Sequence, residues 1–378
     1  MNTKIVNFDG LIDLGKVMKI GFDAKRAFHN NTGLGNYSRF IIEALLKYVP
    51  QNECFAYTPK LSKRDLGIKT ILPKNKFLWR TWLIKNNLQR DSIQIYHGLS
   101  NELPFGKIPN GIKTVVTIHD LIFERYPRLY PFFDTLIYKI KFRYACRNAD
   151  IIIAVSEQTK RDIIEFYGTN PDKIKVIYQD CDKAFQVKLS SEKVKEVTEQ
   201  YEIKKKYILS VGSIIERKNQ ANLVAAFHQL NLSNYQLVLV GGRSKYQEQI
   251  EKYIKGNNIP NVNILNKVPF QDLPALYQGA SLFVYPSFFE GFGIPIVEAL
   301  HSGVPVVAAT GSCLEEAGGA GALYANPDNI DDLADKMITV LANKDLQKQL
   351  IQAGQKHVQQ FGAERIAGRL NEIYQELI

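Results

Sequence analysis

The sequence predicts an α/β protein made of two consecutive domains, each built around a parallel β-sheet. Three observations support this fold class. Short runs of β-branched and aromatic residues alternate with amphipathic stretches along the chain, which is typical of βαβ units. Most runs in the second half are apolar throughout, as expected for strands covered by helices on both faces. A chain of 378 residues is also long enough to bury two hydrophobic cores.

The strand candidates fall into two series separated by the polar segment 180–193. The first series comprises 18–24, 53–59, 92–98, 113–120, 150–156 and 173–179. Helical stretches within it include 35–48, 76–89, 131–147 and 157–167. The second series comprises 207–213, 235–242, 261–267, 281–287, 304–310 and 322–326, and the chain after Asp328 reads as successive helices. We therefore place the domain boundary near residue 185.

The composition excludes several classes of protein. No apolar run approaches the roughly 18 residues of a membrane span, and the first residues lack the pattern of a signal peptide. The first strand opens at Met18, and residues 1–17 are interpreted either as an extension before it or as a misplaced start. Four widely spaced cysteines read as free thiols of a reducing compartment. We therefore expect a cytoplasmic protein.

The net charge of +10 is concentrated in the first half of the chain. Residues 1–185 contain 29 basic against 18 acidic residues, and the remainder is nearly balanced. This pattern is compatible with a solvated basic surface, or with an anionic partner such as phospholipid or a lipid pyrophosphate. No helix-turn-helix, zinc-finger or RNA-binding signature accompanies the charge, so nucleic acid is not expected as a partner.

The strongest functional signal is PSFFEGFGIPIVEALHSGVPVV (286–307). A buried strand ends at Pro286, a glycine-rich turn presents Glu290, and Pro295 suits the first turn of a helix that carries Glu298. Because a helix start with uncovered amides binds phosphate, and carboxylates accept hydrogen bonds from sugar hydroxyls, the segment predicts a nucleotide-sugar site. The alternative is an ordinary helix start with incidental acidic residues.

The E-x7-E spacing, together with EGFG and PIVEA, resembles the donor-site signature of retaining family 4 glycosyltransferases. The resemblance implies the GT-B fold, with two Rossmann-like domains facing a central cleft. It places an acceptor-side domain at 1–184, a nucleotide-sugar domain at 185–361 and a last helix, 362–378, that returns to the first domain. It also implies that Glu290 contacts the transferred sugar, that Glu298 contacts the ribose, and that the amides of Phe292 and Gly293 lie beside the phosphate or sugar.

A second strand-to-helix turn, VGSIIERKN (211–219), contains Gly212, Arg217 and Lys218. Cations at this turn can bind a diphosphate and stabilise it as a leaving group. The pair resembles the arginine and lysine of the family. It departs from the pattern in one respect, because many members have an arginine where Ser213 stands. Arg217 and Lys218 are therefore candidates, with Lys218 the closer match.

The first half offers two further candidates. Gly33 and Gly35 in NNTGLGNYSRF (30–40) open a helix after a strand, which fits a tight turn or the family's glycine loop near the donor diphosphate. His119 ends the strand in VVTIHDLIFERYP (115–127). A buried structural histidine is one interpretation, and the resemblance implies contact with the sugar near the reacting carbon.

The sequence suggests neither a metal nor a redox cofactor. Asp180-Cys181-Asp182 mimics the DxD metal motif of another glycosyltransferase fold, but it falls in the expected linker, and Arg217 and Lys218 already supply positive charge. The glycine turns do not form GxGxxG with an acidic residue downstream, which disfavours a nicotinamide cofactor. By resemblance, the donor phosphate itself assists deprotonation of the acceptor, so the expected chemistry is metal-independent.

Two stretches rich in basic and aromatic residues, 74–90 and 130–147, are candidates for the acceptor side of the protein. They fit either packed helices with solvated basic faces or segments that lie on an anionic membrane. Similarity of VVTIHDLIFERYP and GSIIERKN to bacterial mannosyltransferases of polysaccharide and O-antigen assembly suggests transfer of mannose from GDP-mannose to a glycan or lipid-linked acceptor, at the inner face of the membrane. The alternatives are a UDP-sugar donor, a non-hydrolysing sugar-nucleotide epimerase, or an inactive sugar-nucleotide-binding partner.

Overall fold

The computed structural model describes residues 17–378, which fall into two units. Unit 1 comprises the described residues up to Gln179 together with Phe361–Ile378, and unit 2 comprises Asp180–Gln360. The chain therefore leaves unit 1 a few residues before the boundary placed in the sequence. The interpretation of residues 1–17 as an extension falls almost wholly outside the described part of the chain.

Unit 1 contains a seven-stranded sheet in which every neighbouring pair of strands is parallel. In spatial order the strands are β3 (Lys69–Ile71), β2 (Glu53–Tyr57), β1 (Lys19–Asp23), β4 (Ile95–Gly98), β5 (Lys113–Ile118), β6 (Ile151–Ala154) and β7 (Ile174–Val176). Its helices are α1 (Lys25–His29), α2 (Gly33–Tyr48), α3 (Ile84–Arg90), α4 (Ile122–Arg125), α5 (Phe132–Asn148), α6 (Glu157–Tyr167) and α15 (Ala363–Leu377).

Unit 2 repeats this plan with a six-stranded parallel sheet. In spatial order the strands are β10 (Val262–Leu265), β9 (Tyr235–Val240), β8 (Lys206–Val211), β11 (Leu282–Tyr285), β12 (Val306–Ala309) and β13 (Ala322–Ala325). The helices are α7 (Ser191–Gln200), α8 (Gln220–Gln229), α9 (Lys245–Gly256), α10 (Leu273–Gln278), α11 (Ile294–His301), α12 (Leu314–Gly318), α13 (Ile330–Ala342) and α14 (Lys344–His357).

The predicted α/β class is confirmed, because each strand candidate corresponds to an observed strand and both sheets are parallel. The strands form where the sequence predicts them because their side chains are buried on both faces, as in β6 and β12. Local signals fix several helix ends. Ser156 caps α6 by accepting a hydrogen bond from the Thr159 amide, and Gly168 ends that helix with a left-handed φ of 60°.

Two features of unit 1 differ from the sequence prediction. The edge strand β3 was not expected. The helix predicted over 76–89 begins only at Trp79, with a π-helical turn, Trp79–Leu83, that precedes α3. The turn holds Arg80 against the buried carboxylate of Asp23, with 2.5 Å between Nη2 and Oδ2. Helical periodicity cannot predict this ion pair, because its two residues are far apart in the sequence.

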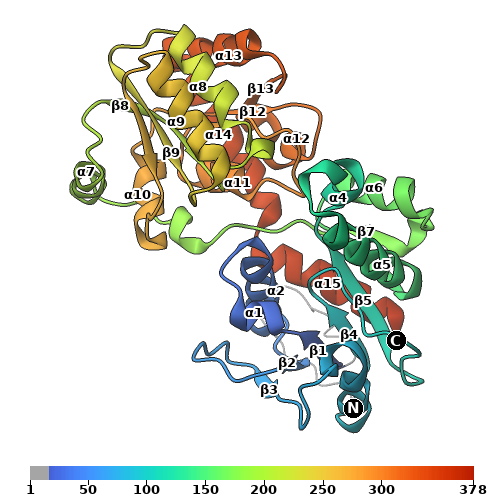
Figure 1. Cartoon of the computed structure of the whole chain (residues 1–378). Helices are drawn as coiled ribbons and strands as arrows, with labels where there is room; N and C mark the ends of the chain where they lie inside the picture. The colour runs from blue at the N-terminus through green and yellow to red at the C-terminus, as the bar shows by residue number, and fades with distance from the viewer. Residues whose placement is uncertain (1–16) are drawn as a thin grey trace. The chain divides into compact units, whose positions relative to one another are not determined.

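The last helix, α15, belongs to unit 1 and lies beside α2 (Figure 1). Its buried Tyr374 hydroxyl is 2.6 Å from Nδ1 of His97 on β4, and Asn371 accepts a hydrogen bond from the Asn52 amide group. Within residues 17–378, none of the helices combines the length and the apolar composition needed to cross a bilayer.

Candidate functional site

Unit 2 places the predicted site at the point where its strand order reverses. The chain runs outward from β8 to β10 on one side and from β11 to β13 on the other, so β8 and β11 are neighbours. In open parallel sheets the ends of such a strand pair form the ligand-binding crevice. Gly212 follows β8 directly, and the EGFG turn follows β11 a few residues later.

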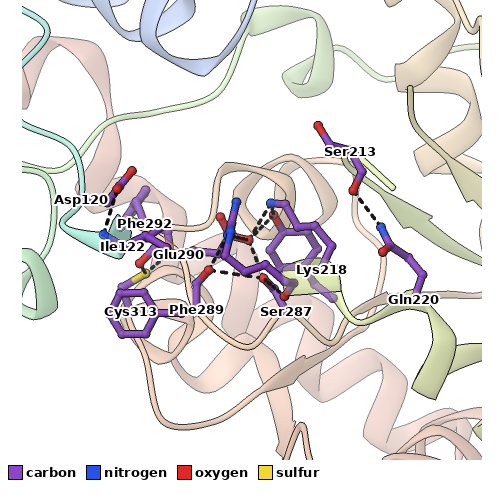
Figure 2. A network of polar contacts seen from close by, with 12 residues as sticks. Asp120, Ile122, Ser213, Lys218, Gln220, Ser287, Phe289, Glu290, Phe292 and Cys313 are labelled. Atoms are coloured by element: carbon purple, nitrogen blue, oxygen red, sulfur yellow. Dashed lines mark hydrogen bonds and ion pairs between the residues drawn. The ribbon is translucent and has the colours of Figure 1, made fainter. Parts of the chain in front are cut away.

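Glu290, Arg217 and Lys218 meet at this edge of the sheet (Figure 2). Oε1 of Glu290 lies 2.7 Å from Nη1 of Arg217 and 2.6 Å from Nζ of Lys218, and all three side chains are largely buried. Burial alone would raise the pKa of Glu290, but Lys218 and Arg217 outweigh it and lower that pKa to about 2. Burial lowers the pKa of Lys218, and the nearby Glu290 partly opposes that effect.

Tyr285 and Ser287 also contact this cluster, although the sequence analysis did not identify them. The Tyr285 hydroxyl accepts a hydrogen bond from Lys218 and lies 3.3 Å from Oε1 of Glu290, while Lys218 Nζ also sits 4.8 Å from the centre of the Tyr285 ring. Ser287 donates to the same Glu290 oxygen at 2.5 Å. A tyrosine that ends an apolar strand and a serine in a turn carry no distinctive pattern, so only the fold reveals them.

The turns around this cluster depend on glycine and on a buried thiol. Gly212 has a φ of 151° and Gly293, the N-cap of α11, has a φ of 138°, a range that other residues rarely adopt. Side-chain atoms of Lys218 and Tyr285 lie within 4 Å of the Cβ position of Gly212. The Cys313 sulfur is 3.0 Å from the Glu290 carbonyl and 2.8 Å from that of Phe292 (Figure 2). Gly212, Gly293 and Phe292 thus shape the predicted site.

Glu298 stands apart from the cluster on α11. Its carboxylate accepts a hydrogen bond of 2.7 Å from the buried Tyr277 hydroxyl. Burial raises the pKa of Glu298 to about 7, with Tyr277 opposing and Asp182 reinforcing the shift. An aromatic row connects the two glutamates, since Phe283 packs 5.1 Å from the Tyr277 ring and 6.0 Å from the Tyr285 ring.

His119 lies in unit 1, just beyond the end of β5. It is buried, and its Nε2 is 2.9 Å from the Leu99 carbonyl, so Nε2 carries the proton and Nδ1 holds the lone pair. Burial lowers the pKa of His119 to about 4, so the ring is neutral at pH 7. A role with the sugar would therefore be that of a hydrogen-bond acceptor at Nδ1.

Gly33 and Gly35 form the first turn of α2, and the structure distinguishes them. A Cβ atom on Gly35 would lie 1.9 Å from the Asn30 carbonyl oxygen, whereas one on Gly33 would meet nothing within 4 Å. The Gly35 amide is also 3.2 Å from Oδ1 of Asn30. Gly35 is thus required by the close approach of the backbone. The same helix brings Tyr37 edge-on to His119, with 4.6 Å between ring centres.

Asp180, Cys181 and His301 are the described residues best suited to a metal ion, because their ligand atoms lie within 4.8 Å of one another. Nε2 of His301 is already hydrogen-bonded to Oδ1 of Asp180 at 2.8 Å, and burial raises the pKa of the Cys181 thiol well above its usual range. Instead of a free linker, Asp180 and Cys181 form a hydrogen-bonded start of unit 2.

Comparison with known proteins identifies both halves of the chain. Residues 61–182 match the family described as Glycosyltransferase Family 4, and residues 192–357 match Glycosyl transferases group 1. The chain is 28% identical over 288 residues to the O-antigen chain mannosyltransferase B of Escherichia coli, covering 75% of this chain and 74% of the relative. It is 31% identical over 219 residues to the O-antigen chain mannosyltransferase RfbU of Salmonella typhimurium, covering 57% of each.

The fold matches solved structures over almost the whole chain, and some of these are described as glycosyltransferases. The structure of Anabaena Alr3699/HepE in complex with UDP and glucose superposes with a TM-score of 0.73 at 18% identity, covering 95% of this chain and 100% of that one. The two parallel sheets are accordingly those of the GT-B fold. With a Glycosyltransferase Family 4 domain followed by a group 1 domain on this fold, the chain belongs to the GT-B glycosyltransferases.

Proposed function

We propose that this glycosyltransferase transfers mannose from GDP-mannose, with retention of configuration, to a glycan or lipid-linked acceptor. The observation that carries the proposal is the cation pair Arg217 and Lys218 beside Glu290, at the switch point of unit 2. The choice of mannose is supported by the Escherichia coli and Salmonella relatives, which are described as O-antigen chain mannosyltransferases.

In the proposed reaction the acceptor hydroxyl oxygen bonds to the sugar C1 as the bond from C1 to the diphosphate breaks. The hydroxyl proton passes to the departing phosphate. Lys218 and Arg217 stabilise the negative charge that develops on the leaving group, which is the step where fixed charges accelerate such reactions most. The amides at the Gly293 start of α11 offer a second anchor for the phosphate.

The two glutamates have separate proposed tasks. Glu290 exchanges its ion pairs for hydrogen bonds to the sugar, and Glu298 accepts hydrogen bonds from the ribose hydroxyls. His119, Gly33 and Gly35 of unit 1 keep the roles that the family resemblance predicts for them, contact with the sugar and with the diphosphate. Metal independence is part of the proposal, because the positive charge needed by the diphosphate is supplied by side chains.

Calorimetric titration with GDP, UDP, GDP-mannose, UDP-glucose and UDP-N-acetylglucosamine, in the presence of a chelator, tests the donor. We expect GDP and GDP-mannose to bind selectively. Lys218→Ala should weaken GDP binding by at least about 30-fold through loss of a charge-assisted contact. Lys252→Ala, an exposed lysine on α9, is the matched control and should bind normally.

Other outcomes of the titration, combined with analysis of the reaction products, identify the alternatives. Selective binding of UDP would replace GDP-mannose by a UDP-sugar donor. A product isomer formed from donor alone would indicate an epimerase. Tight donor binding without transfer to any polysaccharide or lipid-linked saccharide acceptor would favour an inactive partner. Binding of none of the five ligands by folded protein would refute the donor site.

A further inference from the structure

Helix α5 carries an apolar stripe on its solvent side. The exposed fractions of five apolar residues are 76% for Phe132, 76% for Phe133, 47% for Leu136, 48% for Ile137 and 55% for Ile140. The last four lie one, four, five and eight residues after Phe132, which places all five on one face of the helix. The opposite face already packs into the core of unit 1 through Phe142, Ala145 and Cys146. The residues of the stripe are therefore not needed to pack α5 against the core of unit 1.

A second group of exposed apolar side chains surrounds the π-helical turn before α3. The exposed fractions are 74% for Phe77, 51% for Leu78, 47% for Trp82 and 38% for Leu83. Leu78 has a left-handed φ of 47°, an unusual conformation for a leucine. The backbone thus adopts a strained geometry at a point where large apolar groups face solvent.

The two elements that carry these groups pack together through Phe105, whose ring lies 5.9 Å from Trp82 and 4.4 Å from Tyr144 of α5. Lys85 strengthens the junction by donating to the Phe105 carbonyl at 2.9 Å, with its ammonium 5.6 Å from the Trp82 ring. We call the nine exposed apolar residues of both groups the apolar surface. Large exposed apolar patches of this kind mark interaction sites.

The two segments that carry the apolar surface are rich in basic residues. Residues 74–90 contain five basic residues and no acidic one, and α5 contains four basic residues and one acidic one, Asp134. Several of these charges serve the fold, since Arg80 pairs with Asp23, Lys139 with Glu124 and Lys141 with Glu102. Lys74, Lys76, Arg143 and Arg147 are exposed.

We propose that the apolar surface and its basic border dock unit 1 onto an anionic phospholipid bilayer. Apolar and aromatic side chains can enter the boundary between headgroups and acyl chains, while exposed lysine and arginine meet lipid phosphates. Trp82, half exposed next to Lys85, has the amphipathic character of residues at that depth. A second copy of the chain is a poorer partner, because pairing this surface with itself would bring two basic borders together.

Flotation with vesicles tests the proposal independently of donor chemistry. Full-length protein is mixed with vesicles of phosphatidylcholine alone or with about 30% phosphatidylglycerol, and flotation is measured at low and high salt. We expect binding to the anionic vesicles only, weakened by salt. The double variant Phe133→Ser/Ile137→Ser should lose at least about tenfold in affinity. In the double variant Lys76→Gln/Arg147→Gln, the affinity for anionic vesicles should fall roughly fivefold for each charge removed.

Matched controls lie elsewhere on the molecule. Leu61→Ser/Val187→Ser removes comparably exposed apolar groups, with exposed fractions of 74% and 58%, and should float like the wild type. Lys252→Gln/Lys255→Gln, two exposed lysines of α9, is the charge control and should also float normally. All substituted side chains are exposed, and melting curves verify that the variants are folded.

Tryptophan fluorescence gives a second readout. The chain has two tryptophans, of which Trp79 is 3% and Trp82 is 47% exposed. Lipids with brominated acyl chains should quench emission from Trp82, and Trp82→Phe should abolish the quenching. Equal flotation of wild type and Phe133→Ser/Ile137→Ser would overturn the proposal. The proposal would also be overturned if sedimentation showed a wild-type dimer, the double variant were a monomer, and neither protein bound vesicles.

Discussion

Oε1 of Glu290 lies 2.6 Å from Nζ of Lys218, so a carboxylate of the protein occupies the place where an anionic ligand would meet this cation. Arg217 contacts the same oxygen at 2.7 Å. A single carboxylate thus pairs with both cations of the proposed diphosphate site and leaves the three groups with a net positive charge. In the proposed function, donor binding rearranges this cluster, because a diphosphate replaces Glu290 at the two cations and the carboxylate turns to the sugar.

Glu290→Gln separates the two roles of this residue. The amide keeps the shape of the side chain but no longer competes for Arg217 and Lys218, so we expect GDP to bind about tenfold more tightly. Transfer at saturating donor should fall about 100-fold, because a charge-assisted contact to the sugar is lost. Calorimetry and a transfer assay measure the two effects, with Glu248→Gln on the exposed side of α9 as control. Weaker GDP binding by a folded Glu290→Gln protein would show that the carboxylate assists the diphosphate instead of competing with it.

Tyr285→Phe tests the residue that holds the cluster together. The variant keeps the ring that packs beside Phe283 and over Lys218 but removes the hydroxyl that contacts Lys218 and Glu290. Loss of these hydrogen bonds should lower kcat about tenfold, with a smaller change in donor KM and in melting temperature. Tyr285→Leu, which also removes the ring, should lower the melting temperature as well. Wild-type kcat and KM in Tyr285→Phe would remove the hydroxyl from the mechanism.

The raised pKa of Glu298 predicts that donor binding depends on pH. Burial is the main cause that raises its pKa in the folded protein from the ordinary value of 4.5 to about 7. Between these values the folded protein binds more protons than the unfolded chain, so this group's contribution to stability decreases as pH rises through that window. Ribose hydroxyls donate best to the ionised carboxylate, so affinity should fall about tenfold between pH 8 and pH 6.

The ligand for this measurement is an intact nucleotide sugar, because its diphosphate diester does not titrate in the range. Glu298→Gln should bind more weakly at pH 8 and show a flat profile. A profile of the same slope in wild type and Glu298→Gln would assign the titration to another group.

The two glycines at the start of α2 form a matched pair for testing the backbone geometry. Gly35→Ala forces a Cβ atom against the Asn30 carbonyl, a backbone atom that cannot move aside, and should destabilise unit 1 by about 2 kcal/mol or more. Gly33→Ala meets open space in a helical turn and should be neutral or stabilise by up to about 1 kcal/mol. Thermal unfolding of both variants measures the difference. Similar melting temperatures would contradict the close approach.

Periodicity predicted the strands well and the irregular segments poorly, for physical reasons. Buried strands such as β6 require apolar side chains on both faces, so an apolar run in the sequence identifies them. The edge strand β3 has two exposed residues and one partly buried one, and nothing in that pattern distinguishes it from a loop. The turn at Trp79–Leu83 is held by the ion pair between Arg80 and Asp23, which are distant in the sequence.

The candidate site shows the same division. Arg217, Lys218 and Glu290 were predicted because each lies in a compact motif next to a strand end, and the parallel sheet brings these ends together. Tyr285, Ser287 and Cys313 were missed, because a strand tyrosine, a turn serine and a lone cysteine have many ordinary uses. Their importance arises only where they face Glu290 and Lys218.

The location of α15 in unit 1 has a consequence for biosynthesis. During translation unit 2 emerges as one uninterrupted segment, Asp180–Gln360, whereas unit 1 needs residues from both sides of that segment. The partners of His97 and Asn52, namely Tyr374 and Asn371, leave the ribosome only after the whole of unit 2. Unit 1, although begun first, is therefore completed after unit 2, and a nascent chain halted before Phe361 would hold all residues of unit 2 but only part of unit 1.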